Sequence, residues 1–475
     1  MKQKFIFIRP FYPERMKHQS IQLGLLYLGA VLEKNGYRVK IYDLNNLEIT
    51  NHQVIKYLEA EKPDFIGVSG LSYDFFGMIE LCNLIKQNEK LKIKLLIIGG
   101  VHVSSLPEYS LKKTHADIAV IGEAEESIVE LLSTINNNDN LKKVKGIGFF
   151  ENNNYYQTER RPLIENLDSI PFPAWHLIDI KRYTLPHALF LKKLPFFAII
   201  TTRGCTFRCT YCASHSFWRD RIRFRSIKNV VDEIEYLIKV YNAKEIQIWD
   251  DNFTLKRSYV IEFAKEIARR KIKILFSCPN GVRIDTLDEN LLKIMRSIGF
   301  YSLLFGVETP SKNIQKIIKK DLKLESVPII INQAKKLGYF TRASFIIGLP
   351  GETINDLYQT LNYSLKLKID NANFLMFNPL AGSEFFNIWL KNKDIDEVDW
   401  SCDYFNKPQS MIGFNTISRK QLKKIRGYIY LRFYFIRFWK GIYLILQYRI
   451  KQYKILVDRI IHYFSQSRWN LKDDS

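Results

Sequence analysis

Long apolar runs are missing from this chain, and their absence limits the classes of protein that it can encode. Its 475 residues contain no run of about eighteen apolar residues, which a membrane-crossing helix needs. The N-terminal sequence MKQKFIFIRPFYPE has a short apolar stretch that Arg9 and Pro10 interrupt, so it does not resemble a secretory signal peptide. We therefore expect a cytoplasmic protein, and the hydrophobic content of 47% is enough for large buried cores.

Cysteine is scarce, and three of the six cysteines lie together in the run TTRGCTFRCTYCASH. Cys205, Cys209 and Cys212 have C-x3-C-x2-C spacing, and the chain has no second C-x2-C pair. A structural zinc site uses four ligands, usually in two such pairs, so the spacing disfavours zinc. Three thiolates can instead hold three irons of a 4Fe-4S cluster and leave the fourth iron open. The alternatives are an incomplete zinc site and cysteines that only pack.

Acidic residues are scarce near the C-terminus, although the net charge of the whole chain is +22. Residues 419–459 contain twelve Lys or Arg and one acidic residue, so half of the net charge lies there. The rest is only mildly basic, which disfavours general nucleic-acid binding. Aromatic residues and cations at helical spacing predict a basic, aromatic helical region over 401–475. Its candidate roles are packing on the preceding domain, peripheral membrane contact through 419–463, or binding of an acidic substrate, carrier or electron donor.

Short apolar runs alternate with helical patterns over residues 1–150. The predicted strands are 5–8, 39–44, 64–70, 93–100 and 116–123. This alternation predicts an α/β, doubly wound (Rossmann-like) domain that binds ligands beyond the carboxyl ends of its strands. The small residues at those ends would let a ligand approach the backbone closely. They are Ser69, Gly70, Gly99, Gly100 and Gly122.

A proline-punctuated linker is predicted over 151–190, and six strand–helix units follow within 191–400. The predicted strands are 196–202, 244–250, 273–278, 301–307, 342–348 and 371–377, with Ser226 and Thr353 as helix N-caps. Six units make a partial (β/α)6, TIM-like barrel with one open side. Such barrels carry their chemistry at the carboxyl ends of the strands.

Polar residues follow several of these predicted barrel strands. The cysteines follow the first strand, Asp251 and Asn252 follow the second, and Glu308 follows the fourth. The alternative for the Asp251 segment is a capping turn, and for Glu308 it is a structural salt bridge. After the fifth strand, Glu352 is either a ligand-binding residue or a cap of the next helix.

These motifs, in this order from Phe196 to Ser383, resemble those of the radical SAM enzymes, which cleave S-adenosylmethionine (SAM). Tyr211 matches the aromatic residue before the third cysteine in that family. The segments QLGLLYLGAVLEKNGYRVKIYDL, GVSGLSYD, GGVHVSSLPE and GEAEESIVELL are similar to the cobalamin-binding domain fused ahead of many radical SAM enzymes. The family therefore implies three cofactors: a 4Fe-4S cluster, SAM and cobalamin.

The resemblance also implies which residues bind these cofactors. The cysteines would hold the cluster, and Tyr211, Asp251, Asn252 and Glu308 would lie against SAM. The residues that would contact cobalamin are Ser69, Gly99, Gly100, His102, Ser104, Gly122 and Glu123. The chain departs from the family at two points. It has no D-x-H-x-x-G motif, so the lower face of a corrin would lack a histidine ligand, and Ala124 replaces the second glycine of the GEGE-like motif.

The family chemistry is reductive cleavage of SAM to a 5′-deoxyadenosyl radical, which removes a hydrogen atom from the substrate. In the cobalamin-dependent group, methylcobalamin then methylates the substrate, and a second SAM restores it. We therefore expect methyl transfer to an unactivated carbon or phosphorus. The alternatives are cyclisation, rearrangement or oxidation, as in the anaerobic Mg-protoporphyrin monomethyl ester cyclase group, or a non-catalytic iron–sulfur protein. The expected partners are a small-molecule or lipid-like substrate and a reductant such as flavodoxin or ferredoxin.

Overall fold

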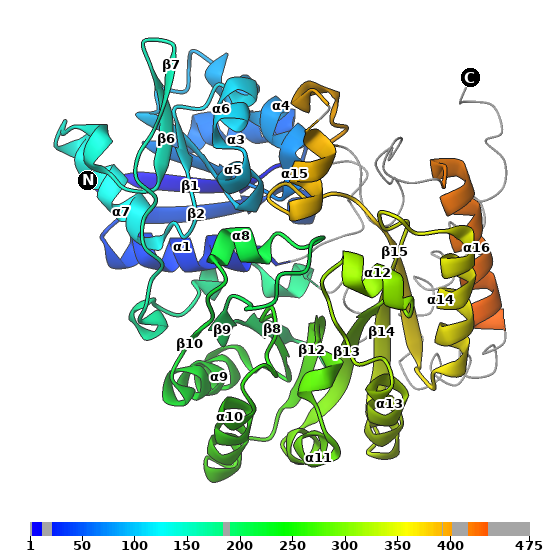
Figure 1. Ribbon diagram of the computed structural model, residues 1–475. Helices are drawn as coiled ribbons and strands as arrows, with labels where there is room; N and C mark the ends of the chain where they lie inside the picture. Colours follow the sequence, from blue (N-terminus) through cyan, green and yellow to red (C-terminus); the bar gives the residue numbers. More distant parts are fainter. Residues whose placement is uncertain (1, 12–20, 184–190, 392, 401–416, 436–475) are drawn as a thin grey trace. The chain divides into compact units, whose positions relative to one another are not determined.

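The computed structural model describes the chain except for residues 1, 12–20, 184–190, 392, 401–416 and 436–475 (Figure 1). Contacts divide the chain into two compact units, each of which gathers distant segments. The first comprises Met1–Pro186, Thr201–Glu233 and Pro379–Cys402, and the second comprises His187–Ile200, Ile234–Asn378 and Asp403–Ser475. The domains predicted from the sequence are continuous ranges, whereas each of these units is made of separate segments. The two divisions cannot be matched range by range, so the predicted domain boundaries stay a prediction.

The first unit contains a seven-stranded sheet with the order β2-β1-β3-β4-β5-β6-β7. The first five strands in sequence are parallel, and the order reverses between β1 and β3, which is where doubly wound sheets bind ligands. All five predicted strands are confirmed. Their bounds are β1 (Lys4–Arg9), β2 (Arg38–Asp43), β3 (Phe65–Ser69), β4 (Leu95–Gly99) and β5 (Ile118–Val120).

Helices cover both faces of this sheet because its strands are apolar on both faces. On one face, Ile6, Ile66 and Leu96 pack in a buried core with Met78 and Leu81 of α4. The helices in contact on this face are α3 (Asn51–Glu61), α4 (Phe75–Lys86) and α6 (Pro107–Thr114); α1 (Leu23–Lys34) and α7 (Glu125–Asn136) contact each other. Two shorter helices are α2 (Leu44–Leu47) and α5 (Val101–Ser105).

A hairpin that the sequence analysis missed extends this sheet. Strand β6 (Ile147–Glu151) pairs antiparallel with β5 and with β7 (Asn154–Gln157). The turn residues Asn152 and Asn153 both have positive φ, at 51° and 66°. A two-residue turn with this backbone matches the twist of a hairpin, and asparagine tolerates it better than most residues do. The first part of the predicted linker is therefore a strand.

Aromatic residues anchor the following segment within the first unit. Trp175 is buried within the short 3-10 helix η5 (Trp175–Leu177). Tyr183 is also buried, and its hydroxyl donates a hydrogen bond to Oδ2 of Asp43 at 3.1 Å.

The second unit contains six parallel strands in the order β15-β14-β13-β12-β11-β8 (Figure 1). All six predicted strands are confirmed, and within the described residues no pairing joins β8 to β15, so the barrel stays open between them. The strands are β8 (Phe196–Ile199), β11 (Glu245–Ile248), β12 (Leu275–Val282), β13 (Phe300–Glu308), β14 (Phe340–Ile347) and β15 (Asn371–Met376).

The connecting helices of this barrel begin where the sequence predicts. The side-chain oxygen of Ser226 accepts a hydrogen bond from Asn229 N at 3.1 Å, and Thr353 forms a capping box with Asp356. The helices are α9 (Ile227–Tyr241), α10 (Arg257–Arg269), α11 (Glu289–Ser297), α12 (Lys312–Ile317), α13 (Ser326–Lys336) and α14 (Ile354–Lys366).

Two further helices follow the barrel strands. Helix α15 (Glu384–Leu390) belongs to the first unit, and α16 (Arg419–Phe435) packs against α14 and β15 in the second. Leu422, Ile429 and Phe433 form the buried face of α16. The predicted helical C-terminal region is therefore confirmed over α16, while 436–475 lies outside the described residues. Among the helices described, none has the length and apolarity that crossing a membrane requires.

Candidate cofactor sites

The three cysteines lie on one loop between two short strands. Strand β9 (Thr202–Arg203) pairs antiparallel with β10 (Arg223–Phe224), and the loop runs between them. Within the loop, Cys212 N donates to Cys209 O at 3.0 Å, and Ser214 N donates to the Cys212 sulfur at 3.4 Å. Cys209 is 9% exposed, while Cys205 and Cys212 are half-buried. The loop therefore presents three thiols at a partly accessible surface.

The thiol set of this loop agrees with the ligand chemistry of an iron–sulfur cluster. Such clusters are held by cysteine thiolates in short spaced runs. Within the described ranges, no three His, Cys, Asp or Glu side chains are already gathered around a point where one metal ion could bind. The backbone N–H group directed at Cys212 is the kind of hydrogen bond that tunes such clusters. The three cysteines therefore fit the predicted 4Fe-4S cluster, and Tyr211, half-buried beside Cys212, lies in the same loop.

Backbone contacts fix the entry and exit of this loop. Gly204 has φ +103°, and a Cβ atom there would lie 1.9 Å from the carbonyl oxygen of Arg221, so only glycine fits. The guanidinium of Arg221 donates two hydrogen bonds to Glu165, at 2.7 and 3.1 Å. Thr210 O accepts from Phe385 N of α15 at 3.0 Å. Contacts within the first unit therefore hold the cysteine loop both in its middle, at Thr210, and near its end, at Arg221.

The small residues predicted to contact cobalamin meet at the carboxyl edge of the first sheet. Gly100 has φ +104°, and a Cβ atom there would lie 2.7 Å from Gly70 O and 3.1 Å from Oγ of Ser69. The Oγ of Ser104 accepts a hydrogen bond from Gly122 N at 2.9 Å. Apart from Gly122 itself and its two chain neighbours, no atom of the described residues lies within 4 Å of the Cβ position of Gly122, so there is open space around it. This glycine-lined edge can accept a bulky ligand against its backbone, and Gly99 lies in it at the end of β4.

His102 does not lie at this open edge. It is fully buried, its ring lies 4.1 Å from that of Phe75 and 4.6 Å from that of Trp400, and Nδ1 lies 3.2 Å from Oγ of Ser72. Burial lowers the pKa of His102 to about 3, so the ring is neutral. Contact with a corrin would require this aromatic cluster to move, and the predicted pocket-lining role of His102 stays a prediction.

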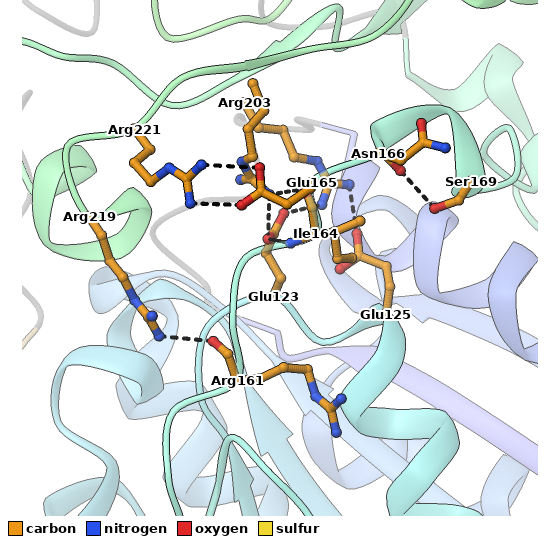
Figure 2. Close-up of polar contacts among 11 residues, drawn as sticks. Glu123, Glu125, Arg161, Ile164, Glu165, Asn166, Ser169, Arg203, Arg219 and Arg221 are labelled. Atoms are coloured by element: carbon orange, nitrogen blue, oxygen red, sulfur yellow. Dashed lines mark hydrogen bonds and ion pairs between the residues drawn. The ribbon is translucent and has the colours of Figure 1, made fainter.

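Glu123, another predicted cobalamin residue, has its carboxylate engaged by protein groups. Oε1 accepts from Nη1 of Arg203 at 2.8 Å and Oε2 accepts from Ile164 N at 2.9 Å (Figure 2). Oε2 also accepts from Nη1 of Arg223 at 2.6 Å. Burial would raise the pKa of Glu123, but the hydrogen bonds and charges of the two arginines outweigh it and hold the pKa below its usual value. Neither Arg203 nor Arg223 was predicted from the sequence, although Arg203 stands in the TTRGC run.

The predicted SAM residues of the second unit lie beyond strand ends. Asp251 and Asn252 follow β11, which pairs with β8, the strand that leads into the cysteine loop. Asp251 is exposed, whereas Asn252 is 3% exposed and accepts a hydrogen bond from Thr254 at 3.3 Å. The amide nitrogen of Asn252 is buried and has no hydrogen-bond partner among the described residues. A buried donor without a partner is costly, so Asn252 suits an incoming ligand with an acceptor group.

Glu308 ends β13 in an unusual backbone conformation and forms a buried ion pair. Its φ of +64° lies in the left-handed region, which costs energy for a residue with a side chain. Oε1 accepts from Nζ of Lys320 at 2.8 Å, and Oε2 accepts from Oγ of Ser344 at 3.3 Å. Gly306 leaves room for this pair, because a Cβ atom there would lie 2.8 Å from Oε1 of Glu308. The salt bridge considered as the alternative is present, and SAM binding by Glu308 stays a prediction.

Glu352 closes the turn after β14 and does not cap α14. Its Oε2 accepts from the backbone N–H groups of Gly348 and Leu349, while Thr353 caps the helix. Burial raises the pKa of Glu352 to about 8. Helix capping, one of the two roles considered for Glu352, is therefore wrong, because its carboxylate already accepts from Gly348 and Leu349, and ligand binding by Glu352 stays a prediction.

Known families and structures match both halves of this arrangement. Residues 199–364 match the Radical SAM superfamily, and residues 15–132 match the B12 binding domain. The radical S-adenosylmethionine methyltransferase TsrM from Kitasatospora setae, solved with cobalamin and a 4Fe-4S cluster bound, has a TM-score of 0.69 with 16% identity, over 84% of this chain and 80% of that one. This likeness shows a shared fold.

Curated relatives extend over most of the chain. An uncharacterized methyltransferase of Pyrococcus horikoshii is 28% identical over 87% of both chains. The cytidylyl-2-hydroxyethylphosphonate methyltransferase of Streptomyces wedmorensis is 27% identical over 83% of both chains. The anaerobic magnesium-protoporphyrin IX monomethyl ester cyclase of Rubrivivax gelatinosus is 28% identical over 76% of this chain and 64% of its own.

The barrel and its cysteine loop define a radical SAM enzyme, whose cofactors are a 4Fe-4S cluster and SAM. More narrowly, a B12-binding domain over residues 15–132 precedes the radical SAM domain over residues 199–364, and cobalamin is the third cofactor. Enzymes of this superfamily act on small molecules and need a reductant.

Proposed function

We propose that the protein is a cobalamin-dependent methyltransferase that acts on an unactivated carbon or phosphorus atom of a small molecule. The observation that carries this proposal is the match to two methyltransferases over at least 83% of both chains. The grouping of the cysteine loop with the B12-binding sheet in one compact unit supports it. Methyl transfer from cobalamin needs the cluster and the corrinoid to serve one substrate. The first unit contains both the three cysteines and the glycine-lined edge of the sheet.

The cofactors supply the difficult chemistry: a radical from SAM that removes a substrate hydrogen atom, and a methyl group from cobalamin. The chain holds and orients them. Cys205, Cys209 and Cys212 would hold the 4Fe-4S cluster, which would supply the electron that cleaves SAM. Asn252 offers its buried amide donor to an acceptor on SAM, such as the carboxylate. The Glu308 carboxylate accepts hydrogen bonds from the ammonium or ribose of SAM at the end of β13.

The glycine-lined edge of the first sheet takes the corrinoid. Gly100, Ser104 and Gly122 bring backbone and hydroxyl groups to the ligand without bulky side chains in the way. This edge is formed at the carboxyl ends of β4 and β5, and open α/β sheets bind ligands beyond the carboxyl ends of their strands.

Cyclisation or a related oxidation is the second candidate, because the chain is also similar to a porphyrin ester cyclase. The products of SAM separate the two. A methyltransferase consumes the methyl group of SAM, so S-adenosylhomocysteine accumulates together with 5′-deoxyadenosine, and only when cobalamin is present. The test is anaerobic incubation of reconstituted protein with SAM, reductant and candidate substrates, with both products quantified. Formation of 5′-deoxyadenosine and a converted substrate without S-adenosylhomocysteine would favour the cyclase-type reaction.

The reductant is a small acidic electron carrier such as flavodoxin or ferredoxin, which suits the basic charge of the chain.

The outer face of α16 supports peripheral contact with an anionic membrane and hence a lipid-like substrate. Lys420, Lys423 and Lys424 are exposed on α16, as are Tyr428 and Leu431. The ring of Tyr428 lies 6.4 Å from that of exposed Tyr358 on α14, so apolar side chains of two helices adjoin the cations. Cations next to exposed aromatic residues are typical of interfacial helices.

A further inference from the structure

The pairing of β9 with β10 brings two arginines to the base of the cysteine loop. Arg203 lies two residues before Cys205 and is the pairing partner of Arg223. Both arginines are buried, at 8% and 4% exposure. Two buried cations side by side are unfavourable unless carboxylates compensate them.

That compensation comes from the B12-binding domain. Glu123 bridges the two arginines, and Glu125 at the start of α7 accepts from Nη2 of Arg203 at 2.6 Å (Figure 2). The guanidinium of Arg203 also lies 5.3 Å from the ring centre of Tyr27 on α1. The Nε and Nη2 atoms of Arg223 are buried without a hydrogen-bond partner among the described residues, so Glu123 is the carboxylate that its charge depends on.

Glu123 has one end at each predicted cofactor site. Its backbone follows Gly122, whose N–H group is bonded to Ser104 at the glycine-lined edge. Its side chain holds Arg203, and the chain passes from Arg203 through Gly204, which tolerates no side chain, to Cys205. A displacement of the strand-end loop at Gly122 is therefore transmitted to the first cysteine through a short series of buried, well-packed groups.

We propose that Glu123 and Arg203 are positioning residues that couple corrinoid binding at the B12-binding sheet to the cysteine loop that holds the cluster. Each cofactor orders the same buried ion pairs, so the presence of one strengthens the binding of the other by the same factor. The proposal rests on the cofactors of the family and is independent of the substrate and of the type of reaction.

The experiment measures the dissociation constant of hydroxocobalamin for full-length protein in two forms, one with a reconstituted cluster and one without it. Their ratio is the coupling factor, and we expect at least about fivefold tighter binding by wild-type protein that contains the cluster. In Glu123→Gln the ratio should fall to near one. Damage to the fold alone would weaken binding in both forms and leave the ratio unchanged.

Two further variants make the result decisive. Arg203→Lys keeps the charge, but one ammonium group cannot bridge both Glu123 and Glu125 as the guanidinium fork does, so its ratio should also approach one. This variant decides the question if Glu123→Gln does not fold, as judged by circular dichroism. Glu61→Gln is the matched control, because Glu61 also bonds two cations, Lys4 and Lys40, but at the amino end of β1. The proposal is overturned if the wild-type ratio is one, or if Glu123→Gln and Arg203→Lys keep the wild-type ratio.

Discussion

Nζ of Lys320 donates a hydrogen bond to Oε1 of Glu308 across 2.8 Å, and both side chains are more than nine-tenths buried. The pair lies at the carboxyl end of β13, where Glu308 adopts a left-handed backbone and Gly306 leaves it space. A strained residue in a buried ion pair at a strand end is costly to maintain without a ligand-binding role. Glu308 thus combines an uncommon backbone conformation with a buried charge at the end of a barrel strand, and both features support the proposed SAM contact.

Replacing Glu308 by glutamine should weaken SAM binding by at least about tenfold, because a charge-assisted hydrogen bond becomes a neutral one. Isothermal titration of reconstituted protein with SAM, under anaerobic conditions, measures the change. Glu266→Gln is the control, since Glu266 pairs with Arg269 and Arg270 on the outer helix α10. Equal SAM affinity in wild type and Glu308→Gln would contradict this role.

Gly100→Ala should destabilise the protein by roughly 1–3 kcal/mol, because its backbone conformation suits only glycine and the added Cβ meets Gly70 O. Gly99→Ala is a close control: the nearest atom to its Cβ position is 3.8 Å away. Urea unfolding of the cofactor-free protein should separate the two variants. Comparable loss of stability in both would mean that the conformation at Gly100 is not the cause.

Stability should depend on pH through Glu245, whose pKa burial raises to about 7 from an ordinary value of 4.5. Tyr301 and the backbone of Lys192 hydrogen-bond this buried carboxyl group. The folded state holds the proton more tightly than the unfolded state. The contribution of this group to stability is therefore fully present below about pH 4.5 and is lost as the pH rises through about 7.

The size of this loss follows from the pKa difference and is on the order of 3 kcal/mol. Glu245→Gln cannot ionise, so the decrease in its free energy of unfolding between pH 5 and pH 8 should be smaller than in wild type by about that amount. Urea unfolding at both pH values measures it. Identical pH dependence in the two proteins would show that Glu245 titrates normally.

Membrane contact through α16 predicts that the full-length protein sediments with vesicles of anionic phospholipid. Reversing the charges of Lys420, Lys423 and Lys424 to glutamate should abolish this sedimentation, because electrostatic attraction falls by several charges. The control triple, Lys265→Glu with Lys271→Glu and Lys273→Glu, reverses three exposed charges elsewhere in the same unit. If both triples sediment like wild type, or if wild type does not bind the vesicles, α16 is not a membrane contact.

The sequence predicted the parallel strands of both sheets because each is a short, largely buried apolar run between helical patterns. It also predicted the N-caps Ser226 and Thr353, since capping depends on residues within one turn. The β6–β7 hairpin was missed because its strand 154–157 is polar and mostly exposed. The pair Asn152–Asn153 is the signal that could have identified its turn.

Contacts between distant residues set the limit of the prediction at the site. Glu123 and Arg203 are eighty positions apart, and no local pattern in one sequence indicates that they pair. Likewise, GGVHV places His102 near the ligand edge, but Phe75 and Trp400 surround it in the folded protein. The positive φ of Gly100 and Gly204 could be predicted in part, because a glycine just after a strand often adopts a backbone conformation that other residues avoid.

The central claim is that the three cysteines hold a cluster that cleaves SAM. Its most direct test is anaerobic reconstitution, with iron and cobalamin quantified, followed by incubation with SAM and reductant and measurement of 5′-deoxyadenosine. We expect 5′-deoxyadenosine from the wild-type protein and none from Cys209→Ala. Absence of 5′-deoxyadenosine from wild-type protein with a full cluster, or equal production by Cys209→Ala, would contradict it.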